Sequence, residues 1–394
     1  MRFPEFSGEW EQHSLSDYLR FKNGLNPDAK RFGKGIKFIS VMDILNNASI
    51  SYDCVRASVA ATEQEISDFE VEYGDVLFQR SSETLEDIGR SNIYVDSRHC
   101  VFGGFVIRGK KIGEYEPYFM KYRLDSPYAR KSIIVKGAGA QHFNIGQEGL
   151  SKVDLFFPKY EEQVKIGDLL RIIDDRINTQ SKIIEELTTL RSALHQGIMS
   201  TGLKDGSWRM QTLAEVLSER TELNNEGHAV HSVSVSKGIV NQIEYLGRSF
   251  AAKDTSRYHV AYPGDVIYTK SPTGEFPYGI VKQSQISIKA ALSPLYGVYV
   301  PISPEIGYII HNHFLSAKNA LNYLHPLIQK GAKNTINITN QRFLQNSMPL
   351  PTNKNAALLY YNAIKTVSDK IILEEMVMEK FQSQKSFLLK TMFI

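Results

Sequence analysis

The 394-residue sequence predicts a mixed α+β fold, in which two globular domains are separated by a pair of long antiparallel α-helices with a pseudo-twofold internal repeat. Three observations lead to this prediction. Motifs recur with a period near half the chain, each half contains short β-branched and aromatic runs, and each half ends in a long segment of helical periodicity. A chain of this length also exceeds one ordinary hydrophobic core, which favours two or three domains.

The internal repeat is carried by short motifs at a nearly constant offset. GEW at Gly8–Trp10 returns as GSW at Gly206–Trp208, an offset of 206 − 8 = 198. YGDVLF in the first half is matched by PGDVIY in the second, and KGAGAQHFNI from Lys136 is matched by KGAKNTINI from Lys330. Insertions and deletions in loops would produce the small drift in offset between these pairs.

Each half is predicted to be one mixed domain followed by one long helix. The predicted boundaries are 1–157 for the first domain, 158–201 for the first helix, 202–350 for the second domain and 351–394 for the second helix. Runs such as GDVLF and GDVIY are typical of strands, and EPYFMKYRLDSPYARKSII and EIGYIIHNHFLSAKNALNYL have helical spacing. A proline precedes each long helix, where its missing N–H group costs little.

In both long helices the apolar residues step by three and four, which is typical of a coiled-coil seam. Polar residues interrupt the two seams at corresponding places, because 374 − 180 = 194 for Gln180 and Glu374, and 385 − 191 = 194 for Arg191 and Lys385. Full antiparallel overlap would place Gln180 near Glu374, where a polar pair fixes the register at some cost in stability. The predicted seam residues are Ile173, Ile177, Gln180, Ile184, Leu187, Val367, Ile371, Glu374, Met378 and Phe381.

A single helix with such a seam would also suit an ordinary core or a homodimeric coiled coil. Two matched helices in one chain favour an intramolecular pair instead. The first helix carries the chain to the second domain, and the second helix returns from it, so the path favours antiparallel packing. Two similar but non-identical domains on a rigid pair of helices could hold two recognition surfaces at a fixed distance, and DNA half-sites at a set spacing reward that geometry.

The composition predicts a soluble cytoplasmic protein. Apolar residues make up 42% and charged residues 23% of the chain, and no run approaches the eighteen apolar residues of a membrane span. The N-terminus has no apolar stretch typical of a secretory signal. Cys54 and Cys100 are too few for a disulfide scaffold or a zinc site. The net charge of +3 permits nucleic-acid binding without requiring it.

The sequence contains no motif that predicts catalysis. We find neither an Asn-Pro-Pro-Tyr/Phe methyltransferase motif nor a phosphate-binding Gly-x-x-x-x-Gly-Lys-Ser/Thr loop. The HNH triplet at His311–His313 lies in a helical stretch, and the further ligands that a metal site needs are not apparent. We therefore predict no catalytic residue and no metal site.

The end of the first domain carries a recognisable passage. GAQHFNIGQEGLSKV followed by LFFPKYEEQVKIGDLL resembles the specificity (S) subunits of type I restriction-modification systems, which show G-x-x-x-x-N-I…L…P-x-x-E-Q-x-x-I where each target-recognition domain ends. The order of domain, helix, domain, helix extends the resemblance over the whole chain. The second copy departs from the pattern, because Asn355 and Ala356 stand where Glu162 and Gln163 stand in the first. The residues that match the pattern in the first copy are Gly139, Asn144, Ile145, Leu150, Pro158, Glu161, Glu162, Gln163 and Ile166.

This resemblance implies a function. Each target-recognition domain of an S subunit reads one part of a split, asymmetric site in double-stranded DNA. The helices set the gap and dock two methyltransferase (modification) subunits, which bring S-adenosylmethionine. Restriction/translocase subunits, which use ATP and Mg²⁺, join this complex and cleave the DNA. By resemblance, the chain itself has no cofactor, no catalytic activity and no membrane partner.

Base readout requires polar side chains on loops that reach a groove of the DNA. The candidate loops follow the GDV strands and precede the long helices. The candidates are Arg80, Ser81, Ser82, Lys136, Gln141 and Asn144 in the first domain, and Thr269, Lys270, Thr273, Lys330, Lys333 and Asn334 in the second. The basic segment Lys121–Lys131, with its two tyrosines, either follows a phosphate backbone or is a solvated helix face. Each loop position could equally be solvated or bonded within a turn.

Two other functions remain open from the residues alone. One is a coiled-coil adaptor that spaces two protein partners, which would show no salt-dependent DNA binding. The other is a DNA-modifying enzyme with an unrecognised motif, which would be active as an isolated chain. A recognition subunit would instead direct methylation only with its partner.

Overall fold

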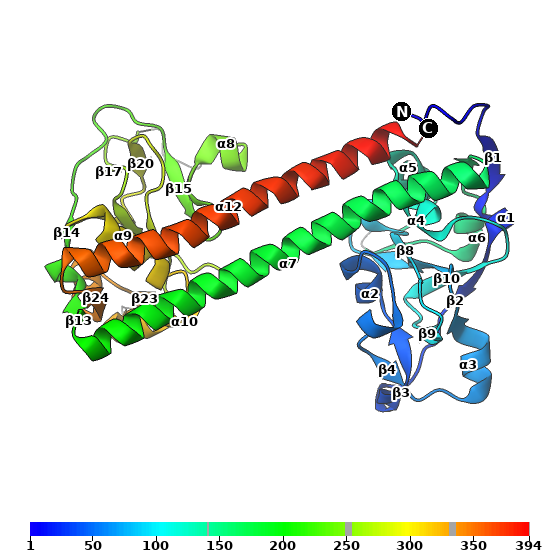
Figure 1. Ribbon diagram of the computed structural model, residues 1–394, viewed down its shortest axis with the longest axis horizontal. Coiled ribbons are helices and arrows are strands. Elements are labelled where there is room, and N and C mark those ends of the chain that lie inside the picture. The colour runs from blue at the N-terminus through cyan, green and yellow to red at the C-terminus, as the bar shows by residue number, and fades with distance from the viewer. Residues whose placement is uncertain (140–141, 249–253, 331–335, 394) are drawn as a thin grey trace. The chain divides into compact units, whose positions relative to one another are not determined.

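The computed structural model describes residues 1–139, 142–248, 254–330 and 336–393. The chain forms two compact units, the first made of Met1–Ile184 with Glu374–Ile394 and the second of Glu185–Leu373. Each unit contains one domain of strands and short helices together with parts of the two long helices α7 and α12 (Figure 1). Among the described residues, no helix is both long and apolar enough to span a lipid bilayer.

The domain of the first unit is built on two four-stranded sheets, ordered β2-β10-β6-β8 and β4-β3-β9-β5, with the small ladders β1-β12 and β11-β7. Its strands are β1 (Glu11–Ser14), β2 (Leu19–Asn23), β3 (Phe32–Ile39), β4 (Ser58–Val59), β5 (Glu70–Val71), β6 (Val76–Gln79), β7 (Ser81–Ser82), β8 (Ser91–Ile93), β9 (Cys100–Phe102), β10 (Val106–Lys111), β11 (Phe143–Asn144) and β12 (Asp154–Phe157). Its helices are α1 (Leu15–Tyr18), α2 (Val41–Asn46), α3 (Glu63–Phe69), α4 (Pro117–Asp125), α5 (Pro127–Ile134) and α6 (Gln147–Ser151).

The domain of the second unit repeats part of this plan, because its described strands form one four-stranded sheet and several two-stranded ladders. Its sheet β14-β21-β18-β19 corresponds to β2-β10-β6-β8, and its ladder β13-β24 corresponds to β1-β12. Its strands are β13 (Trp208–Thr212), β14 (Leu217–Glu219), β15 (His231–Ser234), β16 (Gly238–Asn241), β17 (His259–Ala261), β18 (Val266–Tyr268), β19 (Val281–Gln283), β20 (Ala290–Leu292), β21 (Gly297–Pro301), β22 (Gln329–Lys330), β23 (Ile336–Asn337) and β24 (Ser347–Pro351). Its helices are α8 (Gln242–Leu246), α9 (Pro304–His313), α10 (Ala317–Leu324) and α11 (Asn340–Phe343).

The doubled GDV motif forms the same turn in both domains. Gly74 and Gly264 adopt φ angles of 91° and 88°, a backbone region that L-residues with a side chain avoid. The carboxylates of Asp75 and Asp265 then accept a hydrogen bond from the backbone N–H three residues earlier, at 3.1 and 2.8 Å. Both aspartates are almost fully buried, so the motif is a structural turn that begins β6 and β18.

Helix α7 runs without a break from Tyr160 to Asp205, and is the green helix in Figure 1. It is longer than predicted, because the sequence suggested an end near residue 201. Gly202 lies inside the helix, where an added Cβ would stand 2.0 Å from the Trp208 ring, so glycine here makes room for the indole. The helix stops at Gly206, whose φ of 79° is the left-handed conformation of a helix C-terminus.

Helix α12 runs from Lys354 to Thr391. The sequence suggested that it begins at 351, but Pro351 is the last residue of β24 and pairs with Trp208 of β13. Asn353 stands just before the helix, and its side-chain oxygen accepts a hydrogen bond from the Ala356 N–H at 3.0 Å. A capping residue therefore marks the helix start better than the proline does.

The two long helices pair antiparallel within each unit. In the first unit Gln180 donates to the backbone oxygen of Glu374 at 3.2 Å and also to its carboxylate. In the second unit the His195 ring nitrogen Nδ1 lies 2.5 Å from the hydroxyl of Tyr360. All ten predicted seam residues are buried or half-buried. The predicted mixed class, doubled domain and antiparallel helices are therefore confirmed.

Candidate nucleic-acid interface

Two predicted DNA-binding loops of the first domain meet in the structure. β7 pairs antiparallel with β11, so Ser81 lies opposite Asn144 and Ser82 opposite Phe143. The Ser81 hydroxyl donates to the side-chain oxygen of Asn144. The backbone oxygen of Arg80 accepts from the N–H of Ile145 at 3.0 Å. Residues 80–82 and Asn144 therefore form one polar surface, although they are about sixty positions apart in sequence.

The side chains of this surface differ in accessibility. Asn144 and Lys136 are exposed, whereas Arg80, Ser81 and Ser82 are half-buried. The Arg80 guanidinium donates to the backbone oxygen of Gly104 at 3.3 Å, which anchors it beside the neighbouring loop. The predicted contact Gln141 lies outside the described residues.

The corresponding loop of the second domain is arranged differently. Thr269 is only 3% exposed, and its hydroxyl accepts a hydrogen bond from the Ile280 N–H at 3.2 Å. Thr269 therefore supports the turn and presents no donor at the surface. Lys270 is half-buried; burial lowers the pKa of its ammonium group, although the nearby Glu219 opposes that shift. Thr273 is exposed in a turn closed by hydrogen bonds with Phe276.

The last candidate loop of the second domain is only partly described. Lys330 ends β22, which pairs with β23. Lys333 and Asn334 lie outside the described residues.

From the sequence, the basic segment Lys121–Lys131 either follows a phosphate backbone or is a solvated helix face. Its N-terminal part does neither, because its charged side chains are buried. Lys121 is 5% exposed and Arg123 is fully buried. The Lys121 ammonium lies 3.4 Å from Asp125 and 3.5 Å from Asp174 on α7. Packing of α4 between the sheet and α7 buries these charges, and carboxylates compensate Lys121 instead of phosphates.

Sequence reasoning missed an exposed basic segment at the start of β3. Lys30, Phe32 and Lys34 are all exposed there. Gly33 and Gly35 adopt φ angles of 94° and 93°, and the register of β3 with β4 shifts across this stretch. The sequence KRFGKG, with cations and an aromatic residue around two glycines, is the signal that could have identified it.

The HNH triplet is part of the second domain's core. His313 is 8% exposed, and the Nδ1 atom of His311 accepts a hydrogen bond from the Gln283 N–H at 3.2 Å. Burial lowers the pKa of both imidazoles to about 3, so they are neutral near pH 7. These contacts place the triplet in a packing role on α9.

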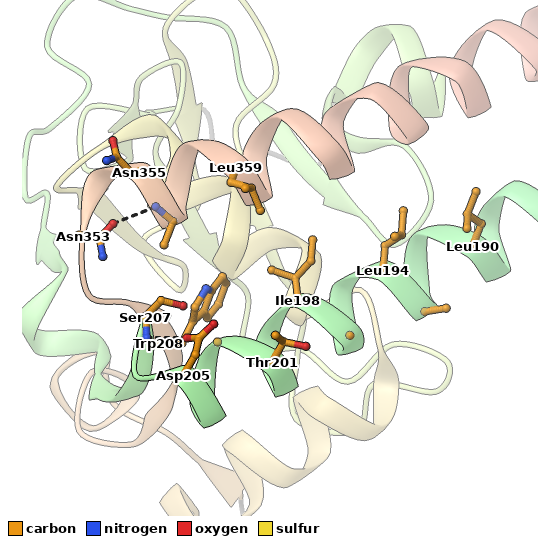
Figure 2. Close-up of a pocket in the computed structure, with 14 residues that line it drawn as sticks. Leu190, Leu194, Ile198, Thr201, Asp205, Ser207, Trp208, Asn353, Asn355 and Leu359 are labelled. Carbon is orange, nitrogen blue, oxygen red and sulfur yellow. Dashed lines mark hydrogen bonds between the residues drawn. The ribbon is translucent and has the colours of Figure 1, made fainter.

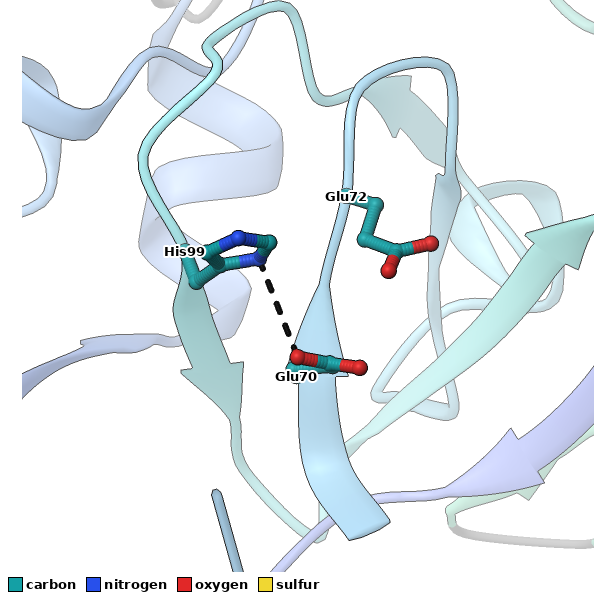
Figure 3. A group of neighbouring side chains, drawn as sticks. All are labelled: Glu70, Glu72 and His99. Carbon is teal, nitrogen blue, oxygen red and sulfur yellow. Dashed lines mark ion pairs between the residues drawn. The ribbon is translucent and has the colours of Figure 1, made fainter. Parts of the chain in front are cut away.

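Another group of potential metal ligands lies at the edge of the first domain (Figure 3). His99 faces Glu70 with 3.8 Å between Nδ1 and the carboxylate, and Glu72 lies beside them. The Lys110 ammonium is 3.1 Å from the Glu72 carboxylate. Because a cation already neutralises one of the acids, the group is a surface ion-pair cluster.

An apolar groove runs between α7 and α12 in the second unit (Figure 2). Its volume is about 680 Å³, and Leu194 and Ile198 of α7, Leu359 of α12 and Trp208 contribute to its wall. Leu359 is 64% exposed, and Leu190 at one end is 46% exposed. Exposed leucines around an apolar hollow are typical of a surface that a partner covers.

In the first unit the N-terminal segment Met1–Ser7 covers the equivalent stretch of the long helices, because the Met1 ammonium donates to the backbone oxygen of Thr391 on α12 and Phe3 packs against the core. Arg2 of this segment pairs with Glu162 at 2.7 Å, and Glu5 pairs with Lys165. These two α7 residues correspond to Ala356 and Leu359 of the open groove, because 356 − 162 and 359 − 165 both equal 194. The chain thus covers this stretch itself in the first unit and leaves the groove of the second unit open.

Comparisons with known proteins agree with this architecture. Residues 7–189 match the family model described as the type I restriction modification DNA specificity domain. The chain is similar in structure to the S subunit of a type I restriction-modification system from M. genitalium, with 12% identity, a TM-score of 0.61, and 100% of this chain and 99% of that chain covered. No curated protein is significantly similar in sequence. The resemblance to S subunits that we noted in the sequence is confirmed.

Two further solved structures match along nearly the whole chain. The HsdS subunit from Thermoanaerobacter tengcongensis has 12% identity and a TM-score of 0.40, over 99% of this chain and 97% of that chain. A structure that describes complex assembly and conformational transition of a type I restriction-modification system has 12% identity and a TM-score of 0.46, over 98% of this chain and 97% of that chain.

Proposed function

We propose that this chain, whose residues 7–189 match the model of the type I restriction modification DNA specificity domain, is a non-catalytic DNA-recognition subunit. It reads a bipartite, asymmetric site in double-stranded DNA, with one half-site for each domain. Methyltransferase subunits dock on the helices and supply S-adenosylmethionine chemistry. Restriction/translocase subunits, which use ATP and Mg²⁺, complete the assembly.

The observation that carries this proposal is the doubled domain with non-identical loops. Both domains contain the same four-stranded sheet and the same GDV turn. Counted from the shared GDV turn, the segments at the ends of β6 and β18 that lead into the next loop read Gln79-Arg80-Ser81-Ser82 and Thr269-Lys270-Ser271-Pro272. They share a cation followed by serine, and they differ at the first and last of these positions. Two domains with the same core sheet but different polar loops suit two different half-sites, because base readout depends on the side chains that reach the DNA groove.

In the first domain the proposed readout centres on Asn144 and Ser81. An asparagine amide can bond the N6 and N7 edge of adenine, and the exposed Lys136 suits a phosphate. In the second domain Lys270 and Thr273 are the described candidates. The positions Arg80, Ser82, Gln141, Lys330, Lys333 and Asn334 belong to the same proposed set.

We infer that the long helices set the gap between half-sites. α7 is one continuous helix of 46 residues, which corresponds to about 70 Å at the usual rise per residue. The contact of Gln180 with Glu374 fixes the register of α7 against α12 within the first unit. A slip of one helix against the other by one heptad would separate these two polar side chains. The pair therefore favours a single register of α7 against α12, and hence a constant gap.

The open groove is the proposed docking surface for one methyltransferase subunit. Its apolar wall suits the apolar face of a helix or an aromatic segment from the partner. The first unit already covers the equivalent stretch with its own N-terminal segment, and there the partner would contact the outside of that segment.

The test is methylation mapping by single-molecule sequencing after co-expression with the methyltransferase encoded beside this chain, in a host without other adenine methylation. We expect methylated adenines in one split motif with a constant gap. Exchanging residues 202–350 for the domain of another S subunit should change only one half of that motif. A soluble complex without methylation would favour the adaptor function, and methylation by this chain alone would reveal an active site.

A further inference from the structure

A small polar cavity of about 150 Å³ lies in the second unit beside α7 and α9. Arg191 and His195 of α7 and Asn312 of α9 belong to its wall. His195 is 6% exposed, and its Nε2 atom is buried without a hydrogen-bond partner among the described residues. When the Tyr360 hydroxyl donates to Nδ1, the proton of the neutral imidazole is on Nε2, and this buried N–H group has no acceptor among the described residues.

Further positive charge lies next to this cavity. The Lys282 side chain on β19 is 4% exposed, and its pKa falls to about 8 because of burial and the charge of Arg191. The same two neighbours, Lys282 and Arg191, also disfavour protonation of the half-buried His311. Within the described part of the chain, neither Lys282 nor Arg191 has a carboxylate at ion-pair distance. A buried ammonium without a counter-charge is unusual in a stable core.

The corresponding cluster of the first unit contains a carboxylate that the second unit lacks. There Asp174 accepts from Lys385 at 2.6 Å and from the Tyr122 hydroxyl at 2.8 Å. Lys385 corresponds to Arg191, because 385 − 191 = 194, and Asp174 corresponds to Ser368, because 368 − 174 = 194. The Ser368 hydroxyl oxygen is buried without a partner among the described residues. The second unit therefore keeps the cation of this pair and replaces its carboxylate with an uncharged residue.

A second carboxylate is replaced in the same way. Helices α4 and α9 both begin with a proline, Pro117 and Pro304, which are 304 − 117 = 187 positions apart. At this offset Asp125, which pairs with a lysine in the first unit, corresponds to Asn312 in the cavity wall. Both acids that neutralise the first cluster are thus absent from the corresponding positions of the second.

We propose that the second unit binds a small oxyanion, such as inorganic phosphate, in this cavity. Arg191 is the charged donor in the wall, the His195 side chain also lines the cavity, and Lys282 supplies long-range charge. The volume equals about five waters at their liquid volume, which suits a tetrahedral oxyanion and excludes a nucleotide. The bound anion then supplies the negative charge that the Asp174 carboxylate supplies in the first unit, and it stabilises the packing of α7 against α9.

The first experiment titrates the full-length chain with inorganic phosphate at constant ionic strength, using calorimetry and thermal unfolding against chloride. We expect one saturable site and a Tm that rises with phosphate concentration. Arg191→Gln should weaken binding at least tenfold, whereas Lys182→Met, an exposed cation on the same helix, should leave it unchanged. A non-saturable effect, or equal binding by Arg191→Gln and the parent chain, would overturn the proposal.

A second variant remains informative if Arg191→Gln does not fold. Ser368→Asp supplies the missing carboxylate within the chain, so it should raise Tm in chloride and abolish the response to phosphate. Ser383→Asp, at an exposed position of α12, is the matched control and should do neither. If Ser368→Asp lowers Tm and leaves the phosphate response intact, phosphate acts elsewhere on the chain and the proposed site is wrong.

Discussion

The buried ion-pair cluster of the first unit provides the sharpest test of the packing described above. Asp174 on α7 is 7% exposed, and its two oxygens accept from Lys385 on α12 and from Tyr122 on α4. Asp174→Asn keeps the volume and the tyrosine hydrogen bond but removes the charge. Lys385 and the buried Lys121 then lose a compensating carboxylate.

Removal of one partner from a buried ion pair costs about 3–5 kcal/mol. Asparagine still accepts from Tyr122, and Asp125 still lies 3.4 Å from Lys121, so we expect the lower end, about 3 kcal/mol. Burial alone would raise the pKa of Asp174, but the Lys121 and Lys385 charges outweigh it and lower the pKa. The stabilisation is therefore complete at neutral pH and is lost as pH falls below about 4.

The assay is urea unfolding of the full chain combined with hydrogen exchange, which separates the first unit from the second. The control is Asp175→Asn, one position along the helix, where the carboxylate is 64% exposed and 3.6 Å from Arg171. An exposed pair of this kind contributes about 0.2–1 kcal/mol. Equal stability of the two variants at pH 7, or a difference that does not shrink as pH falls below about 4, would refute the reasoning.

Three further outcomes are expected. Lys270→Ala should weaken DNA binding by the assembled complex and lower the slope of log K against log salt by about one, which a salt titration measures. Leu359→Glu, in the open groove, should prevent co-purification with the methyltransferase, whereas Ile372→Glu, also exposed on α12, should not. Burial lowers the pKa of His195 to about 4 and of His311 and His313 to about 3, so the second unit should lose up to about 4 kcal/mol per pH unit below about pH 6, visible as a falling Tm.

The features predicted correctly are those that a local motif or a regular spacing along the sequence indicates. The seam periodicity and the equal offset of its polar interruptions predicted that Gln180 meets Glu374, and the structure contains that hydrogen bond. The doubled GDV motif indicated equivalent strands, because the glycine conformation and the aspartate hydrogen bond are local to the turn. Such features can be predicted without knowing which other elements pack against them.

Burial of charged side chains could not be predicted in this way. In α4 the charged residues Lys121 and Arg123 alternate with aromatic and aliphatic residues, so its sequence offers no distinct polar face. Their compensation comes partly from Asp174, more than fifty positions later. Thr269 shows the same limit, since its burial depends on Ile280 folding back over the turn. Contacts that are distant in sequence decide these cases.

Some errors were avoidable from local chemistry. The segment from 116 to 134 was expected to be helical throughout, yet it divides at Ser126, which caps α5 just before Pro127. Serine followed by proline is a helix start, and the same pairing at Ser303 and Pro304 begins α9. Cap residues therefore give better boundaries here than apolar periodicity alone.

The two halves of the repeat differ in a consistent direction. In the first unit the chain's own residues complete both features at the long helices, because Met1–Ser7 covers the equivalent stretch and Asp174 neutralises the cation. In the second unit the groove is open and the corresponding position is Ser368. Divergence by chance would leave such losses as uncompensated costs, since an exposed apolar hollow and a buried unpaired cation both destabilise. A partner that covers the groove and an anion that binds beside the cation would each remove one of these costs. The second unit therefore has the features expected of a surface that binds other molecules.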